Sequence, residues 1–345
     1  MFHGSCTALV TPFKDGAVDY EGLNRLVDFQ VQNGITAILA VGTTGESPTL
    51  AWEEHIRVVD TVAGRTRGKC LCVAGAGSNN TAEALNATEH AVKAGADAVL
   101  LVDPYYNGPS SLEIRKEYIE PVARAFTDVD IIPYIIPGRT GAQMFPEDLA
   151  ILKNSFANVR TVKEATGNLD NMRRTRKVCG DDFFILSGDD GLTYTMMTDA
   201  GIKAAGVISV WSNVAPGPVT AMVKKLADGD LDGAAAIRDA MAPLFDLVTV
   251  TTTETTPHGD VTCRARNPLA LKTLMQILGM PSGPCRRPVG RMTPAGLEVV
   301  LAAARTVWKK HPEILAPVGA FFDVDVESRL FDPKGTDALV YADYA

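Results

Sequence analysis

The sequence lacks the long hydrophobic runs that membrane proteins need. Its best apolar runs, residues 35–41 and 204–211, have the length of a β-strand, whereas a transmembrane helix takes roughly 20 apolar residues. The first six residues, MFHGSC, show neither the charged nor the apolar segment of a signal peptide. We therefore expect a soluble, cytoplasmic protein with no membrane partner.

Cysteine and positive charge are also scarce. Six cysteines in 345 residues are too few for a disulfide framework, and Cys70 and Cys72 alternate within an apolar run as buried strand positions do, so we expect buried free thiols. The chain carries 33 basic and 41 acidic residues, a net charge of -8. Because no basic stretch is present, nucleic acid is not expected as a partner. A small anionic substrate would be bound by a few local cations.

Signatures of several enzyme classes are missing as well. The five histidines are scattered without the helical spacing of a zinc site, and no Gly-Xaa-Ser-Xaa-Gly nucleophile elbow is present. Asp189 and Asp190 are compatible with a metal site, but neighbouring side chains of extended backbone point apart, so we favour solvated loop carboxylates or a helix cap. We predict no metal.

What the chain does have is an alternation of short apolar runs with longer amphipathic ones, the pattern of an α/β protein. Its 345 residues leave one barrel with appendages in competition with two domains. The apolar runs lie at residues 6–11, 37–41, 71–76, 98–102, 131–136, 159–163, 183–187 and 206–210. Eight such units favour a closed (β/α)8 TIM barrel, because eight strands enclose an interior that side chains just fill.

The alternation stops after Val210, and helical periodicity replaces it. We expect the barrel to occupy residues 1–225, with the active site at the C-terminal ends of the strands. Residues 226–310 are expected to form a helical appendage containing a Thr-rich loop at 249–266, since this stretch is polar and punctuated by Pro257 and Gly259. Residues 311–345 form an extension that fits a docking arm or a disordered end equally well.

Polar residues at the ends of the predicted strands are the candidates for chemistry, because barrel enzymes place their sites there. Lys163 ends the sixth strand, and a desolvated amine can form a Schiff base with a carbonyl substrate. The alternative is a rim lysine paired with Glu164. Tyr134, on the neighbouring strand, can shuttle protons in the same cavity, and Arg139 can bind a carboxylate.

Two more strand ends carry hydroxyl groups. The second strand ends in GTTGES, which starts at Gly42. The hydroxyls of Thr43 and Thr44 and the free amides of this turn suit a carboxylate or phosphate, although a capped Gly-rich turn is an equally good interpretation. The fourth strand ends in Asp103-Pro104 followed by Tyr105 and Tyr106. All of these strand ends surround one predicted cavity.

In these motifs the sequence resembles the 4-hydroxy-tetrahydrodipicolinate synthases (dihydrodipicolinate synthases), within the N-acetylneuraminate lyase superfamily of class I aldolases. The resemblance runs from Gly4 to about Leu301, and includes Asn267-Pro268 and Lys272. It implies condensation of pyruvate with L-aspartate 4-semialdehyde in the diaminopimelate route of lysine biosynthesis. It also implies that no metal or organic cofactor takes part.

The resemblance assigns roles to individual residues. It implies that Lys163 holds pyruvate covalently as an imine, and that a proton relay is formed by Thr44, Tyr134 and Tyr106. The substrate-binding residues that it implies are Thr43, Thr44, Arg139, Gly188 and Ile208. In the family the tyrosine that matches Tyr106 reaches in from a neighbouring subunit, so a homodimer or homotetramer is implied.

The resemblance also extends to a pocket where regulated relatives bind lysine. The matching residues are His55, Gly77, Asn79, Glu83 and Tyr105. Pro48 and Trp52, however, stand where regulated forms carry a small and a polar residue. We therefore expect inhibition by lysine to be weak or absent.

Two other functions remain open from the sequence. One is a different pyruvate-dependent aldolase or lyase of the superfamily, of the 2-keto-3-deoxy sugar acid or N-acetylneuraminate type. The loop at Arg139 argues against it, because sugar-acid enzymes need a polyol-binding surface there. The other is a catalytically silent barrel used for binding or assembly.

Overall fold

The computed structural model describes residues 3–344 and contains a closed barrel of parallel strands. Around the barrel the strands follow the order β1, β10, β9, β8, β7, β6, β5, β4. Their bounds are β1 Gly4–Ala8, β4 Ala37–Ala40, β5 Leu71–Gly75, β6 Ala98–Val102, β7 Asp130–Ile135, β8 Thr161–Glu164, β9 Phe184–Ser187 and β10 Gly206–Ser209. Each predicted apolar run overlaps one of these strands, and the predicted (β/α)8 barrel is confirmed.

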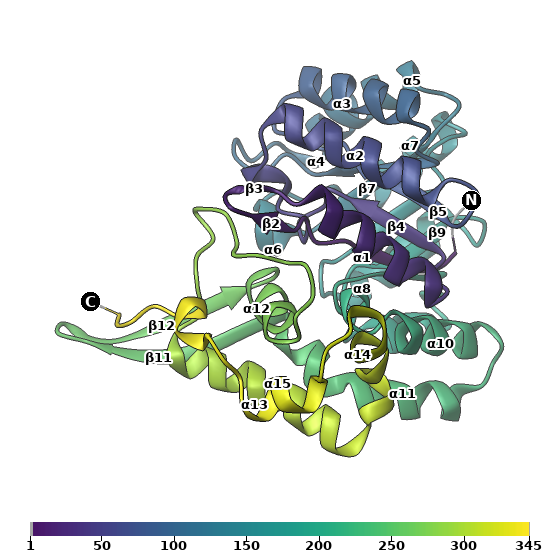
Figure 1. The fold of residues 1–345 in the computed structure, drawn as a ribbon. Coiled ribbons are helices and arrows are strands. Elements are labelled where there is room, and N and C mark those ends of the chain that lie inside the picture. The colour runs from purple at the N-terminus through teal and green to yellow at the C-terminus, as the bar shows by residue number, and fades with distance from the viewer. Residues whose placement is uncertain (1–2, 345) are drawn as a thin grey trace.

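Helices follow the barrel strands and cover the outside of the barrel (Figure 1). They are α1 Tyr20–Gln32, α2 Trp52–Thr66, α3 Thr81–Ala94, α4 Ser111–Glu113, α5 Glu120–Ala125, α6 Pro137–Thr140, α7 Pro146–Ser155, α8 Leu169–Cys179, α9 Thr193–Thr198 and α10 Pro216–Ala227. A π-helical segment, Ile114–Ile119, joins α4 to α5. Helix α1 begins with a capping residue. The Asp19 carboxylate accepts a hydrogen bond from the Gly22 amide at 2.9 Å.

The interior of the barrel is a separate apolar cluster. Its buried members are Cys6, Ala8, Ala37, Leu39, Val73, Ala98, Leu100, Ile132, Tyr134, Leu186 and Ile208. Lys163 pairs in register with Tyr134 on β7 and with Leu186 on β9. Since residues in register share a face of the sheet, the Lys163 side chain points into the barrel.

A helical region follows the barrel. It contains α11 Leu231–Phe245, α12 Leu269–Ile277 and α13 Pro294–Lys310. Helix α11 packs between α10 and α13, and α12 packs against α13. This arrangement brings the N-terminus of α12 back to the mouth of the barrel, where Asn267 contacts Thr44.

The Thr-rich stretch that we predicted as a loop is a β-hairpin, so that prediction is wrong. Strands β11 Thr249–Thr256 and β12 Gly259–Arg266 pair in antiparallel register along their full length, from Thr249 with Arg266 to Thr256 with Gly259. Threonine and valine are β-branched and favour strands, while Pro257 and Gly259 mark only the tight turn. Figure 1 shows the hairpin projecting from the C-terminal half of the molecule.

The C-terminal extension is folded against the rest of the chain. It contains α14 Ala316–Phe322 and α15 Val326–Phe331. The rings of Phe321 and Phe322 lie 5.3 and 5.2 Å from the ring of Phe29 on α1. Arg305 of α13 donates a hydrogen bond from Nε to the Leu330 carbonyl at 2.8 Å. The extension therefore ties the first helix of the barrel to α13.

The cysteines and the helices are each the subject of a further expectation. All six cysteines are free thiols, three of them buried and three half-buried. Within residues 3–344, no helix combines the length and the apolar character that crossing a membrane requires.

Candidate active site

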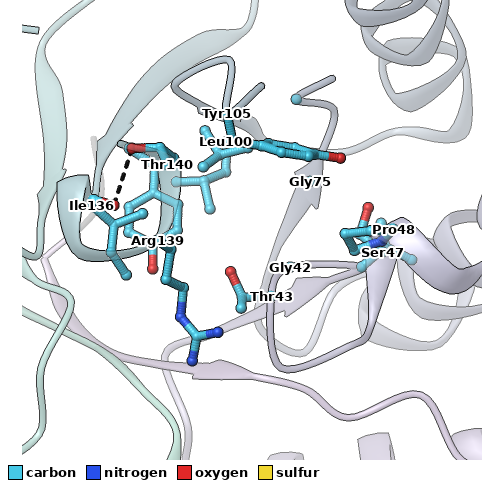
Figure 2. A pocket seen from close by; sticks show the side chains of 14 residues that line it. Gly42, Thr43, Ser47, Pro48, Gly75, Leu100, Tyr105, Ile136, Arg139 and Thr140 are labelled. Carbon is cyan, nitrogen blue, oxygen red and sulfur yellow. Dashed lines mark hydrogen bonds between the residues drawn. The ribbon is translucent and has the colours of Figure 1, made fainter. Parts of the chain in front are cut away.

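A cavity of about 220 Å³ opens at the C-terminal ends of barrel strands. Three of the predicted catalytic and substrate-binding residues line it, namely Thr43, Tyr134 and Arg139. Figure 2 shows the Thr43 hydroxyl and the Arg139 guanidinium on one side of the cavity and the Tyr105 ring across from them. The loops after β4 and β7 therefore deliver their polar groups to one place, as the sequence predicts.

Lys163 lies within the barrel, next to Tyr134. Lys163 is 4% exposed, and its Nζ lies 4.1 Å from the centre of the Tyr134 ring. Glu164, the partner expected for a rim lysine, points elsewhere: its carboxylate accepts hydrogen bonds from the Thr166 amide at 2.7 Å and from Asn171 Nδ2 at 3.2 Å. The interpretation of Lys163 as a rim lysine paired with Glu164 is therefore wrong.

Gly188 lies beside this lysine, and Ile208 belongs to the same barrel interior. A Cβ atom at Gly188 would come within 3.2 Å of Lys163 Cε and 2.8 Å of Ala165 Cβ, so glycine is needed for the chain to pass this close. Ile208 is an interior residue of β10 and is 1% exposed. Gly188 therefore leaves room for the end of the Lys163 side chain.

Thr44 is held by Asn267, the residue that follows β12. Asn267 Nδ2 donates to Thr44 Oγ1 at 3.0 Å, and both residues are buried. Asn267 Oδ1 is buried without a hydrogen-bond partner among residues 3–344. In the sequence, Asn267 stands out only as part of the Asn267-Pro268 pair of the family resemblance, without a role. The strand that precedes it was predicted as a loop, so no other signal marked this position.

Arg139 lies on α6 at the mouth of the cavity. Its Nη2 donates to the Asn267 carbonyl at 2.9 Å. Burial lowers the pKa of Arg139, and the positive charge of Arg266 acts in the same direction. Arg139 thus presents a partly desolvated cation, which strengthens its attraction for a carboxylate.

Tyr106 is not part of this cavity. The residue is 86% exposed, whereas the neighbouring Tyr105 is 40% exposed and lines the cavity. The Tyr105 amide donates to Asn79 Oδ1 at 2.6 Å, which fixes the loop after β6. Of the predicted relay, Tyr134 lines the cavity, Thr44 is buried next to the lining residue Thr43, and Tyr106 is directed outward.

A buried ion pair supports the Thr43-Thr44 turn. Lys272 Nζ lies 2.6 Å from Glu46 Oε1, and the two side chains are 0% and 1% exposed. Lys272 also donates to the Thr11 carbonyl at 3.1 Å, and Glu46 accepts from the Arg286 amide at 2.8 Å. Glu46 has φ of +56°, a left-handed conformation that the pair helps to hold. No pattern in the sequence marks Glu46 as the partner of Lys272.

Asp103 is a second buried acid that sequence analysis did not single out. It is 0% exposed, its Oδ2 accepts from the Met144 amide at 3.1 Å, and its Oδ1 has no partner in the described part of the chain. Burial raises the pKa of Asp103 to about 7. The acid therefore binds its proton more tightly in the folded chain than in the unfolded one.

We expect the Asp103→Asn variant to gain stability relative to the parent as the pH rises. The pKa of Asp103 is near 4 in the unfolded chain and about 7 in the folded chain. The protonated acid therefore contributes its full stability to the parent below about pH 4, and this contribution is lost as the pH rises to about 7. Between pH 5 and 7.5 the difference in the free energy of unfolding should change by about 2 kcal/mol in favour of the variant. Urea unfolding at both pH values measures it, and parallel pH profiles would contradict it.

The adjacent aspartates after β9 point in different directions. The Asp190 carboxylate is buried and accepts hydrogen bonds from Ser209 Oγ and from the amide of Val210 at 2.8 Å. Asp189 Oδ1 accepts from the Gly191 amide at 2.9 Å. The two acids thus bind separate protein groups, and within residues 3–344 no cluster of three or more potential metal ligands is present.

Two residues of the predicted lysine pocket line the cavity. Gly77 and Tyr105 line it, together with Pro48. His55 is 5% exposed, and burial lowers its pKa to about 4, so the ring is neutral at pH 7. The Trp52 ring lies 5.1 Å from the His55 ring. Pro48 thus lies at the cavity and Trp52 against His55.

The closed barrel of parallel strands and the buried amine of Lys163 on β8 are the features that the comparison with known proteins has to match. The model of the dihydrodipicolinate synthetase family matches residues 1–305. The chain belongs to this family and is a lyase of the class I aldolase type.

Individual relatives agree with this assignment. The 4-hydroxy-tetrahydrodipicolinate synthase of Syntrophus aciditrophicus is 40% identical over 298 residues, which cover 86% of this chain and 96% of the relative. The crystal structure of dihydrodipicolinate synthase from Aquifex aeolicus has a TM-score of 0.81 at 38% identity, covering 91% of this chain and 99% of that one. The lysine-bound structure of DHDPS from Cyanidioschyzon merolae has a TM-score of 0.80 at 35% identity, covering 89% and 98%.

Proposed function

We propose that this chain condenses pyruvate with L-aspartate 4-semialdehyde to 4-hydroxy-tetrahydrodipicolinate, with Lys163 as the nucleophile. The observation that carries the proposal is the buried Lys163 amine, 4.1 Å from the Tyr134 ring, in a barrel of this family. The names of the relatives support the same reaction, which belongs to the diaminopimelate route of lysine biosynthesis.

The residues have complementary roles in this reaction. The amine of Lys163 attacks the keto carbon of pyruvate, and loss of water gives an imine. Removal of a methyl proton gives an enamine, whose carbon attacks the aldehyde of the second substrate. The amine of that substrate then attacks the imine carbon, closes the ring and releases Lys163. Tyr134 and Thr44 carry protons to and from these atoms.

Substrate binding falls to groups at the mouth of the cavity. The Thr43-Thr44 turn holds the carboxylate of pyruvate, and Arg139 binds the carboxylate of the semialdehyde. The Gly188 and Ile208 backbones border the imine. The imine itself serves as the electron sink, so the reaction takes place without a metal or an organic cofactor.

Borohydride reduction with pyruvate, followed by peptide mapping, tests the nucleophile. We expect the mass of the reduced pyruvate adduct on Lys163, together with turnover of pyruvate and L-aspartate 4-semialdehyde in a coupled assay. An unmodified protein would support a catalytically silent barrel. A modified Lys163 that cleaves a keto sugar acid but does not turn over the semialdehyde would show a different aldolase.

We further propose a homodimer, or a homotetramer built from two dimers, in which Tyr106 reaches the cavity of the partner subunit. The 86% exposure of Tyr106 supports this, because the side chain has no place in its own cavity. The relay of Thr44 and Tyr134 then needs the dimer to be complete. A sedimenting monomer with full activity would contradict the proposal.

Lysine is expected to inhibit this enzyme weakly or not at all. The bulky Trp52 packs against His55, and Pro48 replaces a small residue at the edge of the same region. We expect half-inhibition only above about 1 mM L-lysine, a binding free energy weaker than about 4 kcal/mol. Initial rates against lysine concentration measure this, and half-inhibition at lower concentrations would contradict it.

A further inference from the structure

Two arginines are tied to each other's backbone at the mouth of the cavity. Arg139 donates from Nη2 to the carbonyl of Asn267 at 2.9 Å, and Arg266 donates from Nη2 to the carbonyl of Gly138 at 3.1 Å. Each guanidinium is thus held by the residue next to the other arginine. The hairpin end and α6 are joined by this reciprocal pair of hydrogen bonds, and the two cations are kept close together.

This pair of cations lacks a counterion within the protein. Among residues 3–344, no carboxylate lies within 4.0 Å of either guanidinium, the distance that defines an ion pair. Arg286, by contrast, pairs with Glu54, and Arg115 pairs with two acids. Like charges held together without an acid repel each other, and a bound anion relieves that repulsion. The arrangement therefore favours an anion at the mouth of the cavity.

Arg266 differs from its neighbour on the same face of the hairpin. Arg264 lies two residues earlier on β12, so both side chains leave the same face of the strand. Both residues are exposed. Only Arg266 bonds α6, the helix that carries Arg139; the side chain of Arg264 forms no hydrogen bond or ion pair within the described residues. The chain thus contains a matched pair of arginines, one bonded to the residue next to the cavity residue Arg139 and one without such a contact.

We propose that Arg266 is a specificity-determining residue that binds the carboxylate of the second substrate together with Arg139. This inference rests on the proposed function, in which that substrate is L-aspartate 4-semialdehyde. A carboxylate has two oxygens, and one guanidinium on each side satisfies both while it neutralises the pair. The hairpin then takes part in substrate binding, since Arg266 is its last residue.

Steady-state kinetics of Arg266→Gln and Arg264→Gln test the proposal in the full-length enzyme. Glutamine at 266 keeps a donor for the Gly138 carbonyl but removes the charge. We expect KM for the semialdehyde to rise about tenfold in Arg266→Gln, with KM for pyruvate and kcat nearly unchanged. Arg264→Gln should behave as the parent, and Arg266→Lys, which keeps the charge, should recover most of the affinity. Equal KM values in Arg266→Gln and the parent, or equal losses in both glutamine variants, would overturn the proposal.

Calorimetric titration with succinate semialdehyde gives a second readout that needs no turnover. This probe keeps the carboxylate and aldehyde but lacks the amine that closes the ring. We expect Arg266→Gln to bind it about tenfold more weakly than the parent and Arg264→Gln to bind it equally well. Parent enzyme that fails to turn over the natural pair would refute the proposed function, while this titration would still decide the role of Arg266. Unchanged affinity in Arg266→Gln would overturn that role.

Discussion

Replacement of Lys163 by methionine is expected to abolish turnover while the barrel stays folded. Without a primary amine no imine can form, and loss of a catalytic nucleophile typically lowers kcat on the order of 10⁴-fold or more. Methionine suits the site because Lys163 is 4% exposed and its amine lies over the Tyr134 ring rather than against an acid. We expect stability to be unchanged or higher by about 1 kcal/mol, since a buried polar group is removed.

The control for this variant is Lys177→Met. Lys177 is exposed on α8, away from the barrel interior. This variant should keep full turnover and the pyruvate adduct on Lys163 after borohydride reduction, whereas Lys163→Met should show neither. Turnover within a hundredfold of the parent in Lys163→Met, or reduced pyruvate on another lysine, would show that the nucleophile is a different residue.

The second large effect is expected from the buried pair of Glu46 and Lys272. Lys272→Met leaves the Glu46 carboxylate 1% exposed beside an apolar side chain. Removal of one partner of a buried ion pair typically costs about 3–5 kcal/mol. For a chain of 345 residues this corresponds to a fall in Tm of roughly 4–7 °C. Thermal and urea unfolding at pH 7.5 measure the change.

Two further variants separate the buried charge from other causes. Glu46→Gln combined with Lys272→Met removes both charges and should recover a large part of the lost stability. Lys224→Met breaks the exposed pair with Asp228, whose side chains are 73% and 57% exposed, and should have no measurable effect. If Lys272→Met is no less stable than Lys224→Met, the buried pair does not hold this part of the fold.

The barrel was predictable because each of its strands is marked by its own apolar run. A strand covered on both faces needs apolar residues throughout, and the gap to the next run is the length of one helix. The hairpin was missed for a local reason. Its strands are polar because they project from the molecule, so they carry no apolar run, and Pro257 and Gly259 dominate the pattern.

The site was predictable where a residue lies at the end of a strand. Lys163 and Tyr134 fall into register on neighbouring strands, so their proximity follows from the barrel itself. Contacts between residues that are far apart in the sequence and do not lie on neighbouring strands have no comparable signal in the sequence. Asn267 reaches Thr44 over a separation of 223 residues, and Arg266 reaches Gly138 over 128. No periodicity in the sequence reports these pairs.

The contact between Phe29 and the C-terminal extension has a consequence for synthesis of the chain. Phe29 is 0% exposed in the finished protein and packs against Phe321 and Phe322. These partners leave the ribosome roughly 300 residues later, a delay of roughly 15–60 s at about 5–20 residues per second. For that time the apolar face of α1 lacks its final cover. Nascent chains of this protein should therefore be clients of ribosome-associated chaperones until translation ends.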